Sequence, residues 1–484
     1  MYESIQSALS SPWLYYALMG IYAFTIIVIL GVVISENRNP VKSLAWVTVL
    51  LMLPVIGIVL YLFFGRSIKN THMISRRNRR KLKKLEHSKG VDIRSLEYGD
   101  ELIQQIKLAR SLSGAYYYGD NNVEIFTDGK TKFNHLISDL KNAQQSINLQ
   151  YYIFEGDTIG NAIAELLKEK ASQGVKVRVI YDHVGSFHVR KKFFKQLQAA
   201  GVEAHPFFKV NFPLLGYRLN WRNHRKIAII DDKIGYIGGM NIADRYIDGG
   251  KFNVWRDNHL RIEGPGVASL LYSFAVDWNF MGQSLIEQQE SQELGGEDKV
   301  SGNVGMQLIT SGPTNQWNNI ELMFHRAIAG AKHRVFIQTP YFLPTEGLMK
   351  ALVAASLSGV DVRLMLPLRT DSAILRYASF SYITECLRAG IKIYLFKPGM
   401  LHSKVLIVDD ELTSIGSTNF DFRSFEHNFE ANVFLYSKQI NEKAAANFLN
   451  DQTESYRVLP DEWRRRPVTR KWAESLLRLL SPVL

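Results

Sequence analysis

Two long apolar segments near the amino terminus dominate the hydrophobic pattern of the chain. Residues 13–34 form a run of 22 and residues 44–64 a run of 21, and neither run contains a charged residue. A helix rises 1.5 Å per residue, so each run is long enough to cross the roughly 30 Å hydrocarbon core of a bilayer. A cleaved signal peptide is disfavoured because residues 1–12 lack Lys and Arg. The pattern predicts a membrane hairpin over residues 1–65, with transmembrane helices of about 13–34 and 44–64.

A different pattern runs from about residue 106 to the end, where strand-like and helix-like periodicities alternate. Residues 146–154 form an apolar, β-rich run, and after a helical stretch residues 174–182 form a turn leading into a buried strand. The same order returns at residues 334–342 and 359–367. Two copies of a unit of about 180 residues predict a duplicated α/β fold.

The breaks between these patterns give the expected domain boundaries. The polar stretch 288–303, rich in Gln, Ser, Gly and Glu, separates the two copies. The expected organisation is a transmembrane hairpin at 1–65, a basic connector at 66–105, a first half at 106–287, a linker at 288–303 and a second half with a basic amphipathic tail at 304–484.

The formal net charge of +12 is concentrated in one short segment. Nine basic residues and no acidic ones lie between Arg66 and Lys84, which leaves about +3 for the rest of the chain. A nucleic-acid-binding protein spreads its positive charge over a folded face, so no nucleic-acid partner is expected. Basic residues beside a membrane span stay in the cytoplasm, which places everything after residue 65 on that side. Such a segment also suits an anionic membrane surface, although a topology signal alone explains it equally well.

Each copy contains one compact polar motif of the form H-x-K-x4-D-x6-G-[GS]-x-N. In the first copy the motif runs from His224 to Asn241, and in the second from His402 to Asn419, 178 residues later. A histidine and a lysine two positions apart on a strand project from the same face. Identical spacing at corresponding points of a repeat indicates a shared function.

Two histidines and two lysines suit reactions at a phosphodiester. One imidazole can attack phosphorus, the other can protonate the leaving oxygen, and the ammonium groups can stabilise the non-bridging oxygens. No acidic metal-binding cluster accompanies the motifs, and the single cysteine, Cys386, excludes a cysteine-rich zinc site. We therefore expect neither a metal nor a cofactor. Binding of a phosphate without reaction is the alternative.

The paired motifs resemble those of the phospholipase D superfamily, in which two such halves share one active site. Other segments are similar to bacterial cardiolipin synthases, and the similarity covers nearly the whole chain. They are Asn39-Pro40, Leu44-Ala45-Trp46, Leu53-Pro54-Val55-Ile56-Gly57, Phe64-Gly65-Arg66, Arg222-Asn223-His224-Arg225-Lys226, Thr339-Pro340-Tyr341-Phe342-Leu343-Pro344 and Leu479-Leu480-Ser481-Pro482-Val483-Leu484. The resemblance implies an α/β protein, in which the membrane hairpin is followed by a duplicated phospholipase D-type α/β/α sandwich with one shared active site.

The resemblance also implies a phosphatidyltransferase, a multi-pass protein of the bacterial cytoplasmic membrane whose partners are phosphatidylglycerol and cardiolipin. One histidine takes a phosphatidyl group from phosphatidylglycerol and releases glycerol, and a second phosphatidylglycerol then accepts the group. By analogy with related lipases, His224 is expected to be the nucleophile and His402 the general acid. Arg222 and Arg225 support this choice, because positive charge beside a histidine lowers its pKa and keeps the imidazole neutral.

The remaining site residues follow from the motifs and from the strands after them. The residues expected to hold the phosphoryl oxygens are Lys226, Lys404, Asn241 and Asn419, and the motif aspartates Asp231 and Asp409 are counted among the catalytic residues. A histidine nucleophile needs its second ring nitrogen occupied. Asp257, 33 residues after His224, and Glu430, 28 residues after His402, are the expected orienting carboxylates, each for the histidine of its own copy. Surface acids at strand ends are the alternative.

Several other interpretations remain open. A membrane-anchored phospholipase D that hydrolyses its substrate fits the same motifs, whereas a nuclease is disfavoured by the low charge of the folded part and a silent scaffold by the intact motifs. Tyr151, Tyr152 and Tyr341 are more typical of a core than of substrate contacts. The tail 463–480 is basic and amphipathic, which suits either contact with a membrane interface or packing on the second half.

Overall fold

The computed structural model describes residues 12–35, 40–61, 69, 72–87, 93–209, 220–286 and 302–481. The chain divides into two compact units, one made of Met1–Ser67 with Asn211–Asn220 and the other of Ile68–Val210 with Trp221–Leu484. Most of the predicted linker 288–303 and the closing residues 482–484 lie outside the described residues.

The described part of the first unit contains α2 (Pro12–Ser35), α3 (Pro40–Met52) and α4 (Pro54–Leu60). The second predicted span, 44–64, is therefore interrupted at Leu53, because a proline at the start of α4 has no backbone N–H to continue the hydrogen bonding of α3. Ile29, Leu50 and Tyr61 form a small buried cluster between these elements. Within the described ranges, the structure contains no helix whose length and apolar character together suffice to cross a membrane.

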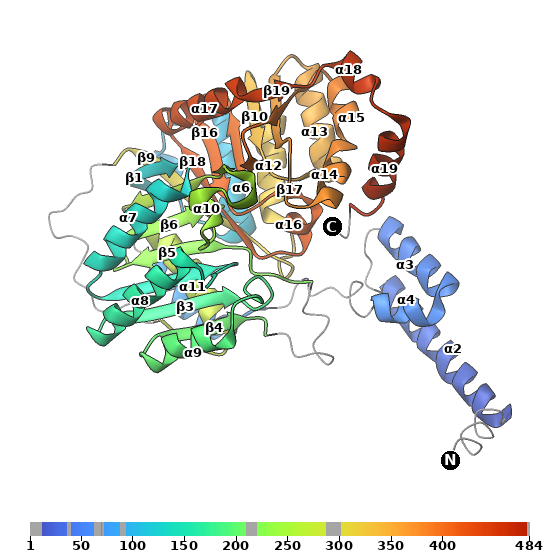
Figure 1. The fold of residues 1–484 in the computed structure, drawn as a ribbon, viewed down its shortest axis with the longest axis horizontal. Helices are drawn as coiled ribbons and strands as arrows, with labels where there is room; N and C mark the ends of the chain where they lie inside the picture. Colours follow the sequence, from blue (N-terminus) through green and yellow to red (C-terminus); the bar gives the residue numbers. More distant parts are fainter. Residues whose placement is uncertain are drawn as a thin grey trace. The chain divides into compact units, whose positions relative to one another are not determined.

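The second unit is built on one continuous sheet of fifteen strands (Figure 1). Its first half contributes β1 (Tyr118–Phe126), β2 (Ser146–Tyr151), β3 (Lys176–Asp182), β4 (Glu203–Phe207), β5 (Lys226–Ile230), β6 (Ile234–Gly238) and β8 (His259–Glu263). Its second half contributes β9 (Val304–Ser311), β10 (Arg334–Gln338), β12 (Asp361–Pro367), β13 (Lys392–Phe396), β15 (Val405–Val408), β16 (Leu412–Gly416), β18 (Glu430–Tyr436) and β19 (Ser455–Arg457).

The strand order shows that the two halves are copies. The first half reads β4-β3-β2-β5-β6-β8-β1 and the second reads β13-β12-β10-β15-β16-β18-β9, with β19 added at the outer edge. The copies join where β1 and β9 pair antiparallel, with Tyr118 opposite Met306. In each copy three strands are parallel, β4-β3-β2 in the first and β13-β12-β10 in the second. The motif strand, β5 or β15, pairs antiparallel with the last of these three and turns into β6 or β16. The predicted duplicated α/β fold is confirmed.

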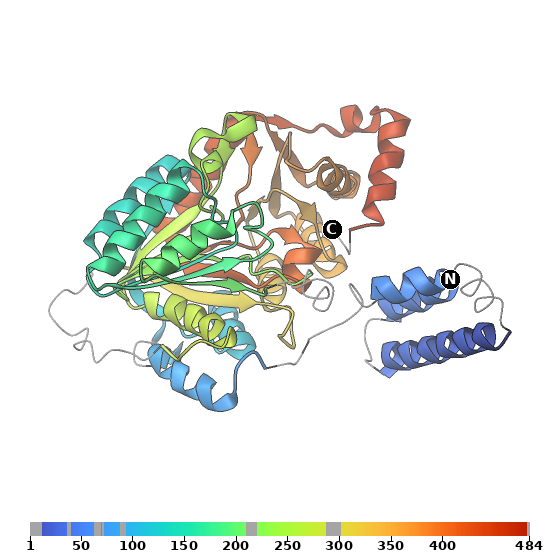
Figure 2. The same ribbon diagram turned by 60° about the horizontal axis from the view of Figure 1, so that its bottom comes forward.

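Helices cover both faces of this sheet (Figures 1 and 2). Those before and within the first half are α5 (Arg76–His87), α6 (Asp100–Ser113), α7 (Gly129–Asn142), α8 (Thr158–Ser172), α9 (Lys191–Ala199), α10 (Arg245–Asp248) and α11 (Val267–Phe280). Those of the second half are α12 (Asn319–Ala329), α13 (Glu346–Leu357), α14 (Ala373–Phe380), α15 (Ile383–Arg388), α16 (Phe422–Glu426), α17 (Lys438–Thr453), α18 (Pro460–Arg464) and α19 (Val468–Arg478). Each half has its own hydrophobic core between sheet and helices, and α5, which carries most of the basic segment, packs against α11.

Candidate active site

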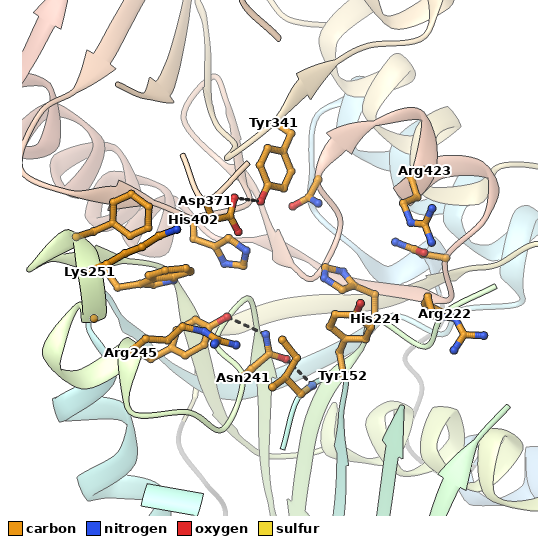
Figure 3. Close-up of a pocket in the computed structure, with 17 residues that line it drawn as sticks. Tyr152, Arg222, His224, Asn241, Arg245, Lys251, Tyr341, Asp371, His402 and Arg423 are labelled. Atoms are coloured by element: carbon orange, nitrogen blue, oxygen red, sulfur yellow. Dashed lines mark hydrogen bonds between the residues drawn. The ribbon is translucent and has the colours of Figure 1, made fainter. Parts of the chain in front are cut away.

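The two polar motifs meet in one pocket of about 610 Å³ that is lined from both halves of the second unit. His224 lies two residues before β5 begins and His402 three residues before β15 begins, so the two copies of the repeat present their histidines at corresponding strand ends. Figure 3 shows the two imidazoles turned into the space between the halves. The pairing of β1 with β9 brings the copies together, so that two sites distant in sequence form one.

Short backbone contacts cross from one half to the other beside each histidine. In one of them β14 (Met400–Leu401) pairs parallel with β7 (Trp255–Arg256), and the His402 N–H donates to the Arg256 carbonyl at 2.7 Å. In the other, the His224 N–H donates to the Phe429 carbonyl at 2.9 Å. Each histidine segment is thus held against the segment that leads into the other half's carboxylate.

The carboxylates that orient the histidines are consequently exchanged between the halves. His224 Nδ1 donates to Glu430 Oε1 at 2.9 Å, and His402 Nδ1 donates to Asp257 Oδ2 at 2.6 Å. The within-copy pairing predicted from the sequence, Asp257 with His224 and Glu430 with His402, is wrong. The physical reason is the pair of cross-half backbone contacts, which place the residue after β7 and the first residue of β18 beside the opposite motif.

These contacts determine which nitrogen of each ring is available. A carboxylate can only accept, so Nδ1 of His224 carries the proton and Nε2 presents its lone pair to the pocket. Nδ1 of His402 lies 2.9 Å from Lys404 Nζ as well, but its shorter contact is the one to Asp257, which assigns the same tautomer to this ring. Burial lowers the pKa of His224 to about 4, with Lys226 assisting and Glu430 opposing. Burial also lowers the pKa of His402, with Lys404 assisting and Asp257 opposing. Both imidazoles are therefore neutral near pH 7.

Glu430 is built to remain ionised although it is fully buried. Desolvation opposes the charge, but His224, Lys226 and the Ser417 hydroxyl together hold the pKa of Glu430 below its usual value. Ser417 Oγ donates to Glu430 Oε2, and Asn428 Nδ2 donates to Oε1 at 3.2 Å. The carboxylate is thus fixed in place before any substrate binds.

The two motif lysines lie buried beside the histidines. Lys226 Nζ donates to the His224 carbonyl and Lys404 Nζ to the His402 carbonyl, each two residues back along the strand. Burial lowers the pKa of Lys404 to about 8 and that of Lys226 well below its usual value. Both lysines are thus fixed directly behind the histidines, and neither is among the residues that line the pocket.

Asn241 and Asn419 line the same pocket, one from each half. Asn241 is held by two contacts, since its Oδ1 accepts from the Ile153 N–H at 3.1 Å and its Nδ2 donates to the Tyr246 hydroxyl at 2.7 Å. Asn419 Oδ1 is buried, and none of the described residues donates a hydrogen bond to it. The structure thus brings together eight of the ten predicted site residues, namely the two histidines, two lysines, two asparagines and the two carboxylates Glu430 and Asp257.

Comparison with known proteins places this arrangement in a family. The model of the "Cardiolipin synthase, PLD-like domain" family matches residues 136–278 and 324–452, and a "Phospholipase_D-nuclease N-terminal" model matches residues 21–66. The chain is 38% identical to the major cardiolipin synthase ClsA of Bacillus subtilis, over 96% of this chain and 98% of that protein. It is 37% identical to cardiolipin synthase 1 of Staphylococcus aureus, over 95% of this chain and 98% of that protein. The chain belongs to the cardiolipin synthase family.

Among solved structures, the phosphatidylserine synthase of Haemophilus influenzae has the same fold. It superposes with a TM-score of 0.57 at 13% sequence identity, covering 79% of this chain and all of that one. The predictions of a phospholipase D-type phosphatidyltransferase and of its family are confirmed by the sequence matches.

The motif aspartates of this cardiolipin synthase family member lie away from the pocket. Asp231 and Asp409 follow the last residues of β5 and β15, about 16 Å along the strand from the lysines. Asp231 accepts hydrogen bonds from the backbone N–H groups of Gln144, Gln145 and Ser146. Asp409 accepts from the corresponding groups of residues 332–334. The catalytic role predicted for both is corrected to a structural one, in which each carboxylate fastens the motif hairpin to the neighbouring strand.

Replacing Asp409 by alanine is therefore expected to lower stability rather than chemistry. A charged acceptor of several backbone N–H groups is lost, which should lower the free energy of unfolding by about 2 kcal/mol, while turnover measured below the unfolding transition is retained. Chemical denaturation of the purified protein gives the first quantity and an activity assay the second. Asp410→Ala, next to it and largely exposed, is the matched control and should change neither. A loss of turnover in Asp409→Ala at unchanged stability would restore the catalytic assignment.

The pocket also contains arginines that the sequence analysis did not single out. Arg245 and Arg423 line it from opposite halves, each four residues after a motif asparagine. The repeated spacing N-x3-R was present in both copies and could have extended the motif to these positions. In Figure 3, Arg245 lies with Lys251 on the His402 side of the pocket, and Arg423 lies with Arg222 on the His224 side.

Two of the three tyrosines expected in the core line the pocket, although one of them, Tyr341, also belongs to the buried cluster of the second half. The Tyr152 ring packs edge-on against His224 with ring centres 5.0 Å apart. Tyr341 donates to Asp371 Oδ1 at 2.5 Å, and both residues are pocket-lining. Tyr151, by contrast, is buried in the core of the first half. Successive side chains along a strand point to opposite faces, so Tyr151 and Tyr152 point in different directions. Only the position of the other half of the fold shows which of the two tyrosines faces the site.

The arginines next to His224 do not act on it as the sequence analysis assumed. Arg222 pairs with the buried Asp182 at 3.3 Å, and Arg225 pairs with the buried Asp277 at 2.5 Å. Their charges are largely neutralised by these partners, and both motif histidines have lowered pKa values for a common reason, which is burial. The charge argument for His224 as nucleophile therefore fails, and the assignment itself stays a prediction.

Proposed function

We propose that this chain makes cardiolipin by transferring a phosphatidyl group between two phosphatidylglycerol molecules through a phosphohistidine intermediate. The observation that carries the proposal is the pair of neutral imidazoles in one pocket, each with Nδ1 held by a buried carboxylate and Nε2 free for chemistry. Two lysines complete the set. The relatives named cardiolipin synthase, matched over nearly their full length, support the same substrate class.

In the first step, Nε2 of His224 attacks the phosphorus of a phosphatidylglycerol. The N–P bond forms as the bond from phosphorus to the glycerol headgroup oxygen breaks, and His402 gives its Nε2 proton to that oxygen, so that glycerol leaves neutral. His402 takes up this proton when the anionic phosphodiester binds, because a nearby negative charge raises the pKa of an imidazole. Glu430 stabilises the positive charge that develops on His224.

In the second step, the terminal hydroxyl of another phosphatidylglycerol attacks the phosphohistidine. His402, now neutral, accepts the hydroxyl proton as the new P–O bond forms and the N–P bond breaks. Cardiolipin leaves, and His224 is neutral again. The two lysines offset charge on the non-bridging oxygens in both steps.

The charge distribution of the pocket favours transfer over hydrolysis, which is the competing outcome. An in-line displacement brings the acceptor in on the side from which glycerol left, which is the His402 side in this assignment. Arg245 stands there over the Trp255 ring, which lies 5.5 Å from the ring of His402. Lys251 lines the same end. The acceptor lipid carries a phosphate of its own that these cations can bind. A water molecule offers no such group, so the cations favour the lipid as acceptor.

The first unit suits attachment to a membrane. Residues 13–34 carry no charge, and several large apolar side chains of α2, among them Trp13, Tyr16 and Phe24, are exposed to the surroundings. We propose that this unit anchors the chain in the bacterial cytoplasmic membrane as a hairpin, with the second unit in the cytoplasm beside its lipid substrates. A reporter fused after Leu484 should register as cytoplasmic, and a periplasmic signal would contradict this topology.

Incubation of the detergent-purified protein with labelled phosphatidylglycerol tests the proposed reaction. Cardiolipin and free glycerol should appear in equal amounts, with little phosphatidic acid, and a chelator should leave the rate unchanged. Phosphatidic acid as the main product would make the protein a hydrolase. Loss of activity in the chelator, restored by one cation, would contradict the metal-free route.

The lowered pKa of Lys404 predicts an alkaline limit to the reaction. Above about pH 8 the free enzyme loses the Lys404 proton, and with it a cation for the phosphoryl oxygens, so kcat/KM should fall as the pH rises through that region. An arginine keeps its charge to far higher pH. Lys404→Arg should therefore lower activity at pH 7 but move the alkaline limb upward. An unchanged limb in this variant would show that another group sets it.

A further inference from the structure

The carboxyl-terminal helix α19 is amphipathic, and it is packed with its polar face inward. Glu474 is buried and accepts from Arg466 Nε at 2.9 Å and from Arg470 Nε at 3.0 Å. Arg478 adds an ion pair to Glu385 at 3.1 Å. The Arg478 ion pair, an Arg466 hydrogen bond to Thr384 Oγ1 at 3.3 Å and the Arg470 guanidinium over the Phe380 ring hold this face of α19 against α14 and α15.

The opposite face of α19 is an apolar ridge exposed to the surroundings. Val468, Trp472, Leu476 and Leu479 follow one another at spacings of four, four and three residues, which places them on one side of the helix. Their exposed fractions are 64%, 74%, 65% and 75%. A soluble surface helix normally turns such a stripe toward the core, so this orientation needs an apolar partner.

The charge around the ridge identifies the kind of partner. Residues 460–481 contain six basic and three acidic residues, and Arg464, Arg465 and Lys471 lie near the start of the ridge. A single-helix ridge with tryptophan and leucine at its crest and Lys and Arg at its sides is the pattern of a helix lying in a membrane interface. A protein interface of comparable apolar content is depleted in lysine at its centre and is broader than one helix.

We propose that the ridge Val468–Trp472–Leu476–Leu479 inserts into the surface of an anionic bilayer and holds the second unit on it. α19 packs on α14, which begins two residues after the pocket-lining Asp371. Insertion of the ridge would therefore orient this wall of the active-site pocket relative to the bilayer that supplies its lipid substrates. This surface belongs to the second unit and does not depend on the chemistry of the site.

The single buried cysteine makes a site-specific test possible. Cys386 is fully buried, so a thiol-reactive fluorophore added to Leu476→Cys in the full-length protein reports on the ridge alone. Leu357→Cys on α13, where the leucine is 70% exposed, is the matched control. In nanodiscs of phosphatidylserine and phosphatidylcholine, the label at 476 should shift its emission to shorter wavelength and be quenched by spin-labelled lipid. The label at 357 should do neither.

Two results would overturn the proposal. One is emission at 476 that stays water-like and unquenched, and the other is a shift without lipid quenching, which would mean that a protein surface, such as a second copy of the chain, covers the ridge. Replacing phosphatidylserine by phosphatidylcholine throughout should weaken the quenching, since the flanking cations then lose their partners.

A functional measurement separates this surface from the proposed reaction. Trp472→Ser combined with Leu476→Ser should reduce turnover of phosphatidylglycerol in bilayers about 10-fold while leaving the melting temperature and the turnover of a short-chain, monomeric phosphatidylglycerol unchanged. Equal turnover in bilayers by the variant and the parent would contradict the proposal. If the parent itself turned over neither substrate, the proposed function would fail, and the quenching result would still decide the membrane contact.

Discussion

Alanine at His224 or at His402 is expected to reduce cardiolipin formation by about 10⁴-fold or more. The two residues act as one unit, because one imidazole must bond to phosphorus while the other moves the proton of the leaving or entering hydroxyl. Removing either leaves a single neutral ring in the pocket. Production of labelled cardiolipin measures the loss, and His135→Ala, at a half-exposed histidine of α7, is the control that should keep its activity. Near-normal turnover in either motif variant would end the shared-site interpretation.

The same two variants assign the nucleophile. A phosphatidyl ester of p-nitrophenol has a leaving group that needs no general acid, so with this substrate His402→Ala should still form the covalent intermediate at a rate close to that of the parent. His224→Ala should form none. Denaturing gels of protein exposed briefly to labelled ester show the intermediate directly. Label retained by the His224 variant and absent from the His402 variant would reverse the two roles.

Glu430→Gln is expected to reduce turnover by about 10³- to 10⁴-fold, although the side chain keeps its size. Glutamine cannot stabilise the imidazolium that forms on His224, and its amide can hold the ring in the wrong tautomer. Asp257→Asn should do the same to His402. Single-turnover rates with phosphatidylglycerol and with the p-nitrophenyl ester measure the two effects separately.

The crossed pairing makes this prediction specific. With the p-nitrophenyl ester, Asp257→Asn should recover together with His402→Ala, and Glu430→Gln should remain defective together with His224→Ala. This grouping holds whichever histidine is the nucleophile, because it depends only on which carboxylate touches which ring. If Asp257→Asn grouped with His224→Ala instead, the observed cross-half contacts would not exist in the working enzyme.

Much of the chemistry was accessible from the sequence because it depends on short spacings. Each motif places its histidine, lysine and asparagine within 18 residues of one another, so the residues gathered at the site could be predicted from the two motifs. The duplication was equally visible, since hydrophobic periodicity reports strands and helices locally, and the order of strands in the two halves proved to be the same. The arginines at the N-x3-R positions were also encoded in this way, and attention to the whole repeat would have found them.

The predictions that the structure corrected concern where residues lie in the fold, not which residues are present. Asp231 and Asp409 belong to the motifs, but they directly follow the motif strands at the end opposite the pocket and bind backbone N–H groups there. The single helix expected over 44–64 is divided in the structure into α3 and α4, and the membrane hairpin itself stays a proposal. The local sequence pattern identified the residues in each case. Their roles depend on the residues that lie beside them in the fold, and the local pattern does not contain these.

The sequence by itself determined the α/β repeat, the family and the identity of the histidines, lysines and carboxylates, because each depends on spacings within a few residues or on similarity along the chain. Only the tertiary structure decided that Glu430 serves His224 and Asp257 serves His402. The two copies are nearly symmetric, so the motifs alone do not show which histidine each carboxylate faces, and the contact of β7 with β14 selects the crossed pairing. The tertiary structure likewise decided which face of α19 points outward, since Arg470 lies over the Phe380 ring of α14 and Arg478 pairs with Glu385 of α15 only when the polar face packs inward.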